Sequence, residues 1–105
     1  MLVLIKKLLG IGPTVNFAQL IKEGAQIIDV RTSGEFASGH IIGSINIPLQ
    51  NITASLTKIK KDKPIITCCA SGMRSASARS ILKSNGYENV FNGGRWASLN
   101  SKLLK

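Results

Sequence analysis

Short apolar runs alternate with helix-like stretches along most of this chain. Residues 25–30 (AQIIDV) and 64–69 (PIITCC) are the two clearest runs, and residues 44–47 and 88–92 (ENVFN) are further candidate strands. Strands that are apolar along their whole length are typical of a parallel sheet covered on both faces. The pattern therefore predicts the α/β class, with a small parallel sheet of about five strands and helices on both faces.

Helix signals lie between these runs. Residues 15–24 carry apolar side chains at helical spacing, with Asn16 as the expected N-cap and Gly24 as the stop. Thr32, followed by Glu35 three residues later, predicts a capping box at the start of a short helical turn. Further helices are expected over residues 49–59, over residues 75–85 with a left-handed end at Asn85-Gly86, and over residues 93–104.

The first 13 residues, MLVLIKKLLGIGP, differ from the rest of the chain. Lys6 and Lys7 interrupt their apolar run, which is far shorter than the ~20 residues of a membrane-spanning helix. The basic start and small-residue cleavage site of a secretory signal are missing. We expect residues 1–13 to form an apolar arm that packs on the domain or frays, without membrane contact, and residues 14–105 to form one domain.

Charge and cysteine content narrow the class of protein. Fourteen basic and five acidic residues give a net charge of +9, which favours anionic partners. The densest basic cluster, KIKKDK at residues 58–63, has no aromatic side chain for base stacking, so nucleic-acid binding is not expected. The two cysteines are adjacent and therefore poorly placed to bridge each other. They predict a reducing, cytoplasmic setting rather than a secreted disulfide framework.

The segment after the third strand carries the candidate chemistry. Cys69 ends the run PIITCC, and a helix is expected to begin about five residues later. The free amides and the dipole of a helix start stabilise a thiolate, which lowers the pKa of the cysteine. The small residues Ala70, Ser71 and Gly72 let the loop curl around the sulfur and point its N–H groups inward. Cys69 is therefore the predicted nucleophile, with Arg74 adding positive charge.

Cys68 has a different prediction. Successive side chains of a strand point to opposite faces, so Cys68 is expected to face away from Cys69 and to be buried as a small apolar residue.

Four segments in order carry a family resemblance: residues 29–36 (DVRTSGEF), 39–48 (GHIIGSINIP), 69–75 (CASGMRS) and the glycine pair 93–94 near Trp96. Over roughly residues 14–105 the chain resembles the single-domain rhodaneses, thiosulfate sulfurtransferase-like modules. The resemblance implies that Cys69 attacks the outer sulfur of a small anionic donor such as thiosulfate and becomes a persulfide. A thiol or cyanide acceptor then removes that sulfur. The expected substrate-binding residues are Ala70, Ser71, Gly72, Met73, Arg74, Ser75 and Arg31.

Two arginines have two interpretations each. Arg74 either meets the sulfonate of the donor, because guanidinium groups bind oxyanions well, or forms an ion pair with Asp29 or Glu35. Arg31 either lines the same pocket or pairs with Glu35.

His40 and the cysteine pair are not expected to bind cofactors or act as bases. A thiolate that its loop already ionises needs no base, so we expect His40, the single histidine, to make structural loop hydrogen bonds. No metal and no other cofactor is expected, because the cysteine pair has no further His or Cys at ligand spacing.

Two alternative functions share features of this pattern. In the related phosphatases five residues separate the cysteine from the arginine, whereas four separate Cys69 from Arg74. The shorter loop forms a smaller anion-binding pocket, closer to the size of a sulfur atom than to that of a phosphate. The second alternative is a persulfide-carrying or regulatory module that exchanges sulfur with a protein partner and turns over thiosulfate poorly. The sequence leaves this alternative open.

Overall fold

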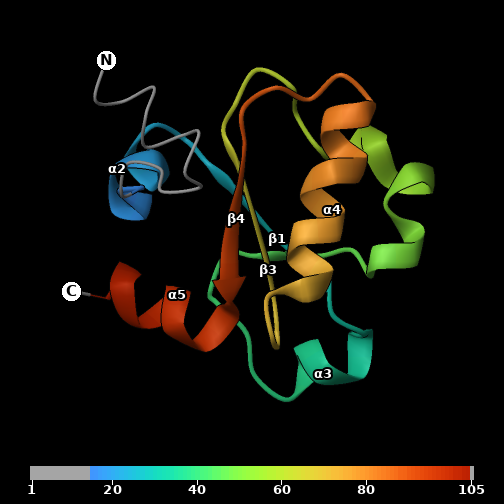
Figure 1. The fold of residues 1–105 in the computed structure, drawn as a ribbon. Helices are drawn as coiled ribbons and strands as arrows, with labels where there is room; N and C mark the ends of the chain where they lie inside the picture. Colours follow the sequence, from blue (N-terminus) through green and yellow to red (C-terminus); the bar gives the residue numbers. More distant parts are fainter. Residues whose placement is uncertain (1–14, 105) are drawn as a thin grey trace, which may run out of the picture.

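The computed structural model describes residues 15–104 and contains a four-stranded parallel sheet in the order β2-β1-β3-β4 (Figure 1). The strands are β1 (Gln26–Asp29), β2 (Ile45–Asn46), β3 (Ile65–Cys69) and β4 (Val90–Arg95). The predicted α/β class with a parallel sheet is confirmed. The count of about five strands is too high for the described residues, because no fifth apolar run of strand length exists in them.

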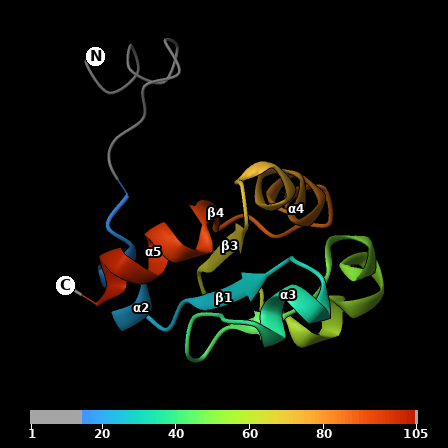
Figure 2. The same cartoon turned by 90° about the horizontal axis from the view of Figure 1, so that it is seen from below.

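Helices cover both faces of the sheet, as predicted (Figure 2). Side chains of α2 (Phe17–Lys22) and α5 (Trp96–Leu103) share one core cluster with Ile27 and Ile66. Side chains of α4 (Met73–Ser84) share the second cluster with Ile28 and Ile65, together with residues around the 3-10 helices η1 (Leu49–Asn51) and η2 (Thr53–Lys58). Neighbouring residues of β1 and β3 thus supply opposite cores, as strand alternation requires.

Local capping signals are borne out. Asn16 caps α2 by accepting a hydrogen bond from the Gln19 amide at 3.0 Å. Thr32 and Glu35 form a reciprocal capping box at the start of α3 (Ser33–Ala37). Gly86, with φ of +89°, follows α4 in the left-handed conformation that ends many helices.

Three helix boundaries differ from the prediction. Residues 49–59 form two 3-10 helices rather than one helix, with a break at Ser55 (φ −119°, ψ 17°). The helix after Cys69 begins at Met73, two residues early, because Gly72 with φ of +98° already turns the chain. The last helix begins only at Trp96, since residues 93–95 extend β4.

Gly93 explains that extension of β4. A Cβ atom there would lie 2.8 Å from both Ile66 Cγ2 and the Thr67 carbonyl oxygen, so only glycine lets β4 run this close to β3. The strand therefore continues past the glycine pair to reach the level of Cys69.

The predicted arm, residues 1–13, lies outside the described residues. Within residues 15–104, no helix has the length and apolar character needed to cross a membrane.

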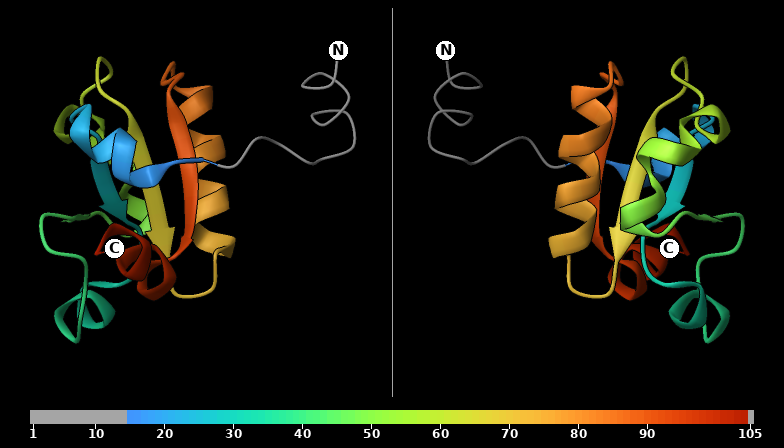
Figure 3. Two further views of the ribbon diagram at one scale, coloured as in Figure 1. Left: turned by 90° about the vertical axis from the view of Figure 1, so that its left-hand side faces the viewer. Right: turned by 90° about the vertical axis from the view of Figure 1, so that its right-hand side faces the viewer.

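The carboxyl ends of the parallel strands meet at one edge of the sheet, where Figure 3 shows the loop after β3 next to α5, with α3 farther along the same edge. Asp29 ends β1, Cys69 ends β3 and Arg95 ends β4. Ligand sites of parallel α/β sheets lie at this edge, because loops there lead into helices.

Candidate active site

The loop after β3 closes around the sulfur of Cys69. Residues 70–72 connect β3 to α4, and Gly72 takes a left-handed conformation that other residues rarely adopt. The Gly72 amide lies 2.9 Å from Cys69 Sγ, and the Ser75 amide lies 3.3 Å from it. Two backbone N–H groups therefore point at one sulfur atom, as the sequence predicted for this loop.

These hydrogen bonds favour the thiolate. Burial alone raises the pKa of Cys69, but the Ser75 hydroxyl and the amides of Ser75, Gly72 and Ser71 outweigh burial and lower the pKa below its ordinary value. The Cys69 residue has no exposed surface.

Cys68 occupies the opposite face of β3. It belongs to the core cluster of Ile27, Ile66 and Leu99, whereas Cys69 belongs to the cluster on the α4 side. Burial, followed by the nearby charge of Asp29, raises the pKa of Cys68 to about 12. Its predicted position as a buried apolar residue is confirmed.

Arg31 is engaged in a buried ion pair. Its guanidinium contacts the Asp29 carboxylate at 2.8 Å and donates to the Gly39 carbonyl at 2.7 Å and to the Glu35 carbonyl at 3.2 Å. It also stacks 4.7 Å from the centre of the Trp96 ring. Of the two interpretations of Arg31, the structure shows an ion pair, but with Asp29 rather than with the Glu35 carboxylate. Arg31 ties the chain after β1 to the next loop and to α5.

Arg74 pairs with Glu35. Its two terminal nitrogens donate to the two carboxylate oxygens at 2.7 and 3.0 Å. This fork, followed by the hydrogen bond from the Thr32 amide, lowers the pKa of Glu35 to about 2. Of the two interpretations of Arg74, the structure shows the ion pair, with Glu35 rather than Asp29 as the partner.

His40 makes the structural contacts expected of it. Its Nδ1 lies 2.7 Å from the Phe36 carbonyl, and its ring stacks on the Phe36 ring with centroids 3.7 Å apart. Because a carbonyl only accepts, Nδ1 carries the hydrogen. Within residues 15–104, no group of three or more His, Cys, Asp or Glu side chains is arranged to hold a metal ion.

Two residues of the site were missed from the sequence. Asn92 of β4 accepts a hydrogen bond from the Ser75 hydroxyl at 2.6 Å. Arg95 is exposed, and its Cα is the register partner of Cys69 across the β3–β4 ladder. Among residues 15–104, Arg95 has no ion pair. Both residues flank the glycine pair Gly93-Gly94, which brings β4 close to β3. Their position beside this pair is the sequence signal that could have identified them.

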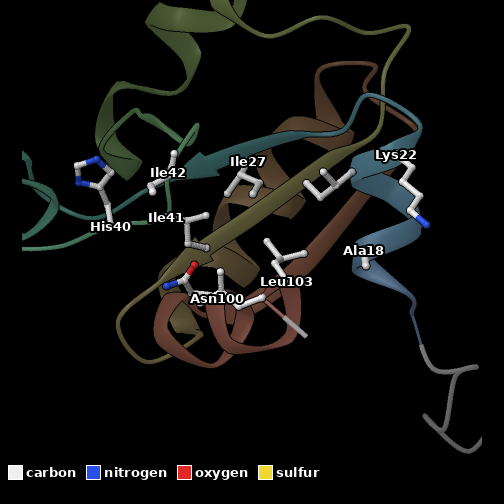
Figure 4. A pocket seen from close by; sticks show the side chains of 10 residues that line it. Ala18, Lys22, Ile27, His40, Ile41, Ile42, Asn100 and Leu103 are labelled. Atoms are coloured by element: carbon white, nitrogen blue, oxygen red, sulfur yellow. The ribbon is translucent and has the colours of Figure 1, made fainter.

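An apolar groove lies on the other side of the sheet (Figure 4). It has a volume of about 590 Å³ and lies between α2, α5 and the loop after α3, with Ile21, Ile41, Ile42 and Leu103 in its wall. Ile27 also lines it and belongs to the Cys68 cluster, so the groove is separate from the thiolate loop.

Comparison with known proteins gives a consistent answer. The model of the rhodanese-like domain family matches residues 15–94. A thiosulfate sulfurtransferase, GlpE, of Pseudomonas fluorescens is 34% identical over 79 residues, which cover 75% of this chain and 72% of the relative. An uncharacterised Bacillus subtilis protein is 41% identical over 68 residues, 65% of this chain, and a sulfurtransferase of Allochromatium vinosum is 34% identical over 70 residues, 67% of this chain. The matches span only 54% and 65% of those two relatives.

Solved structures agree with the sequence relatives. A rhodanese with anions from E. coli superposes with a TM-score of 0.66 at 32% identity, over 70% of this chain and 88% of the other. The human single-domain sulfurtransferase TSTD1 superposes with a TM-score of 0.68 at 28% identity, over 77% of this chain and 88% of the other.

Proposed function

Because this chain belongs to the rhodanese-like family, we propose that it is a sulfurtransferase that uses Cys69 as its nucleophile. Cys69 takes sulfane sulfur from a small anionic donor such as thiosulfate and passes it to a thiol or cyanide acceptor. The observation that carries this proposal is the convergence of the Gly72 and Ser75 amides on Cys69 Sγ, at 2.9 and 3.3 Å.

The first half-reaction is a displacement at sulfur. The Cys69 thiolate attacks the outer sulfur of thiosulfate, the donor's S–S bond breaks, and sulfite leaves with the bonding electron pair. The new outer sulfur of the persulfide carries the negative charge. Amides of residues 70–75 then stabilise that charge, in the way an oxyanion hole stabilises oxygen.

The second half-reaction restores the enzyme. A thiolate or cyanide attacks the outer sulfur, and Cys69 Sγ leaves as a thiolate. The hydrogen bonds that lower the pKa of Cys69 also make its sulfur a good leaving group, because a thiol of lower pKa leaves faster.

The size of the loop favours sulfur over phosphate. Only four residues separate Cys69 from Arg74, and the Gly72 amide contacts the sulfur itself. A tetrahedral phosphate would have to fit between the amides and Sγ. The short loop therefore favours binding of a single outer sulfur atom over binding of a phosphate group.

Arg95 is the proposed contact for the anionic part of the donor. Arg31 and Arg74 are both held by carboxylates, whereas Arg95 is exposed beside Cys69 in the β3–β4 register. Residues 70–75 line the remainder of the site, as the resemblance implied. Two free thiols, Cys68 and Cys69, suit a reducing compartment such as the cytoplasm.

A second candidate function is a persulfide carrier that exchanges sulfur with a protein partner. The carboxylate partners of Arg31 and Arg74 favour it, since they leave fewer cations for a sulfonate. Steady-state turnover with thiosulfate and cyanide separates the two. Slow turnover, together with fast loading from a persulfidated protein, would identify the carrier.

Intact-protein mass spectrometry tests the Cys69 persulfide. After incubation with thiosulfate, the wild type should gain one sulfur, about 32 mass units, which dithiothreitol removes. Cys69→Ser should gain none, and its matched neighbour Cys68→Ser should load like the wild type. Equal loss of loading in both variants would indicate a dithiol mechanism and contradict the proposal, as would an unloaded wild type.

A further inference from the structure

The Ser75 hydroxyl lies near more hydrogen-bond acceptors than its single hydrogen can bind. Ser75 is fully buried, and its Oγ lies 2.6 Å from Asn92 Oδ1, 3.0 Å from the Gly72 carbonyl oxygen and 3.5 Å from Cys69 Sγ. A hydroxyl has a single hydrogen to donate. These contacts therefore compete, and the shortest is the one to Asn92.

The orientation of Asn92 is fixed by the backbone. The Gly94 amide donates to the same Oδ1 atom at 2.9 Å, so the side-chain oxygen, and not its nitrogen, faces Ser75. An oxygen held in this way can only accept. The Ser75 hydrogen consequently points at Asn92 while Cys69 is a thiol, and the thiol donates to Ser75 Oγ.

We propose that Asn92 is a positioning residue that competes with the Cys69 thiolate for the hydroxyl hydrogen of Ser75. When Cys69 loses its proton, its sulfur becomes an acceptor, and the Ser75 hydroxyl turns from Asn92 towards it. Asn92 therefore opposes ionisation of Cys69, while the Gly72 and Ser75 amides promote it.

The hydroxyl then alternates during sulfur transfer, a consequence that rests on the proposed function. In the persulfide, Sγ is neutral and bonded to the outer sulfur, so the Ser75 hydrogen returns to Asn92. When the acceptor removes the outer sulfur, Sγ leaves as a thiolate and draws the hydrogen back. Asn92 thus keeps the thiolate from being over-stabilised, which would weaken it as a nucleophile.

The charged groups around the Cys69 loop are common to all variants below. They are Arg74 of α4 with its partner Glu35 of α3, the Asp29–Arg31 pair after β1, and Arg95 of β4. The Gly72 carbonyl is also constant, as a longer backbone acceptor. A change in the Cys69 pKa on substitution of Asn92 therefore reports the Ser75 contact.

The test is a titration of Cys69 by its ultraviolet thiolate absorbance, in a Cys68→Ala background that leaves one thiol. Asn92→Ala should lower the Cys69 pKa by about half a unit to one unit, the worth of one hydrogen bond. Asn92→Asp, which keeps the acceptor and adds a negative charge, should raise it. Asn89→Ala, at an exposed position just before β4, is the matched control and should change nothing.

A double-mutant cycle with Ser75→Ala gives the decisive result. The effect of Asn92→Ala on the Cys69 pKa should vanish in the Ser75→Ala background, because no hydroxyl hydrogen is then present for Asn92 and the thiolate to compete for. An equal shift in both backgrounds, or no shift in either, would overturn the proposal. The titration needs no sulfur donor, so failure of the proposed sulfurtransferase activity would be seen separately in the mass spectrum.

Discussion

Cys68 and Cys69 are neighbours in sequence and equally buried, yet their surroundings drive their acidity in opposite directions. Cys68 packs among apolar side chains, and within residues 15–104 no hydrogen bond reaches its sulfur; its pKa rises to about 12. Cys69 Sγ accepts hydrogen bonds from two backbone amides and contacts the Ser75 hydroxyl, and its pKa is lowered from the ordinary thiol value. Burial alone therefore does not fix the ionisation of a thiol: it raises the pKa of both sulfurs, and the hydrogen bonds to Cys69 Sγ outweigh it.

The difference comes from strand geometry and from where the strand stops. Alternation sends the two side chains to opposite faces of β3. Cys68 is still within the paired strand, where its carbonyl accepts from the Val30 amide. Cys69 is the last residue of β3, so the next amides are free of the ladder and can turn back to its sulfur.

The largest expected effect is the separation of the two thiol titrations. In single-thiol variants, Cys68→Ala should titrate below the ordinary thiol range and Cys69→Ala only near pH 12. A raise of three units, from 9.0 to about 12, lowers the thiolate population of Cys68 at neutral pH about a thousandfold. Thiolate absorbance measured against pH checks this. Overlapping titrations would show that the loop amides do not distinguish the two sulfurs.

A pair of glycine substitutions should separate the two sulfur environments by activity rather than by stability. Gly93→Ala places a Cβ against Ile66 and Leu99 on the Cys68 face, and should cost about 1–3 kcal/mol of unfolding free energy. Gly72→Ala meets little crowding but strains a φ of +98°, at a similar cost.

Their sulfur loading should differ more than their stability. Relaxing the strain at residue 72 moves its amide away from Cys69 Sγ, so Gly72→Ala should load sulfur poorly, while folded Gly93→Ala should load well. Denaturant unfolding and intact-mass measurements on both variants provide the comparison. Full loading by Gly72→Ala would mean that the Gly72 amide is dispensable.

The features that the sequence predicted correctly are local ones. The Asn16 cap and the Thr32–Glu35 box each join residues three apart, and the apolar run 64–69 with its following small residues marks the nucleophile loop. Each depends on a short stretch of backbone whose geometry its own residues determine. Strand alternation likewise assigned Cys68 and Cys69 to opposite faces.

Long-range partners could not be predicted in the same way. Glu35 is 39 residues from Arg74, and Asp29 was an equally good partner until the fold placed α3 beside α4. Asn92 is 17 residues from Ser75 on another strand, and its role depends on the glycines that let β4 extend. Charge and residue type name the candidates for such pairs, but only packing chooses between them.

The smallest expected effect concerns the ion pair beside the Cys69 loop. Glu35→Gln keeps the capping box, since glutamine also suits that position, but removes the charge that holds Arg74. The freed guanidinium should lower the KM for thiosulfate by about two- to fivefold, with little change in the Cys68 environment. Thr32→Ala is the matched control: it loses the cap, at about 1 kcal/mol of stability, and keeps the ion pair.

The pH dependence of stability supplies a second measurement of the same pair. The folded-state pKa of Glu35 is about 2, below its ordinary 4.5, so the pair stabilises the fold above pH 4.5 and this contribution is lost as the pH falls towards 2. Glu35→Gln should remove that part of the acid dependence, which urea unfolding between these pH values would detect. If the KM stays constant while the acid dependence disappears, Arg74 serves only to hold α3 against the loop, and donor binding falls to Arg95.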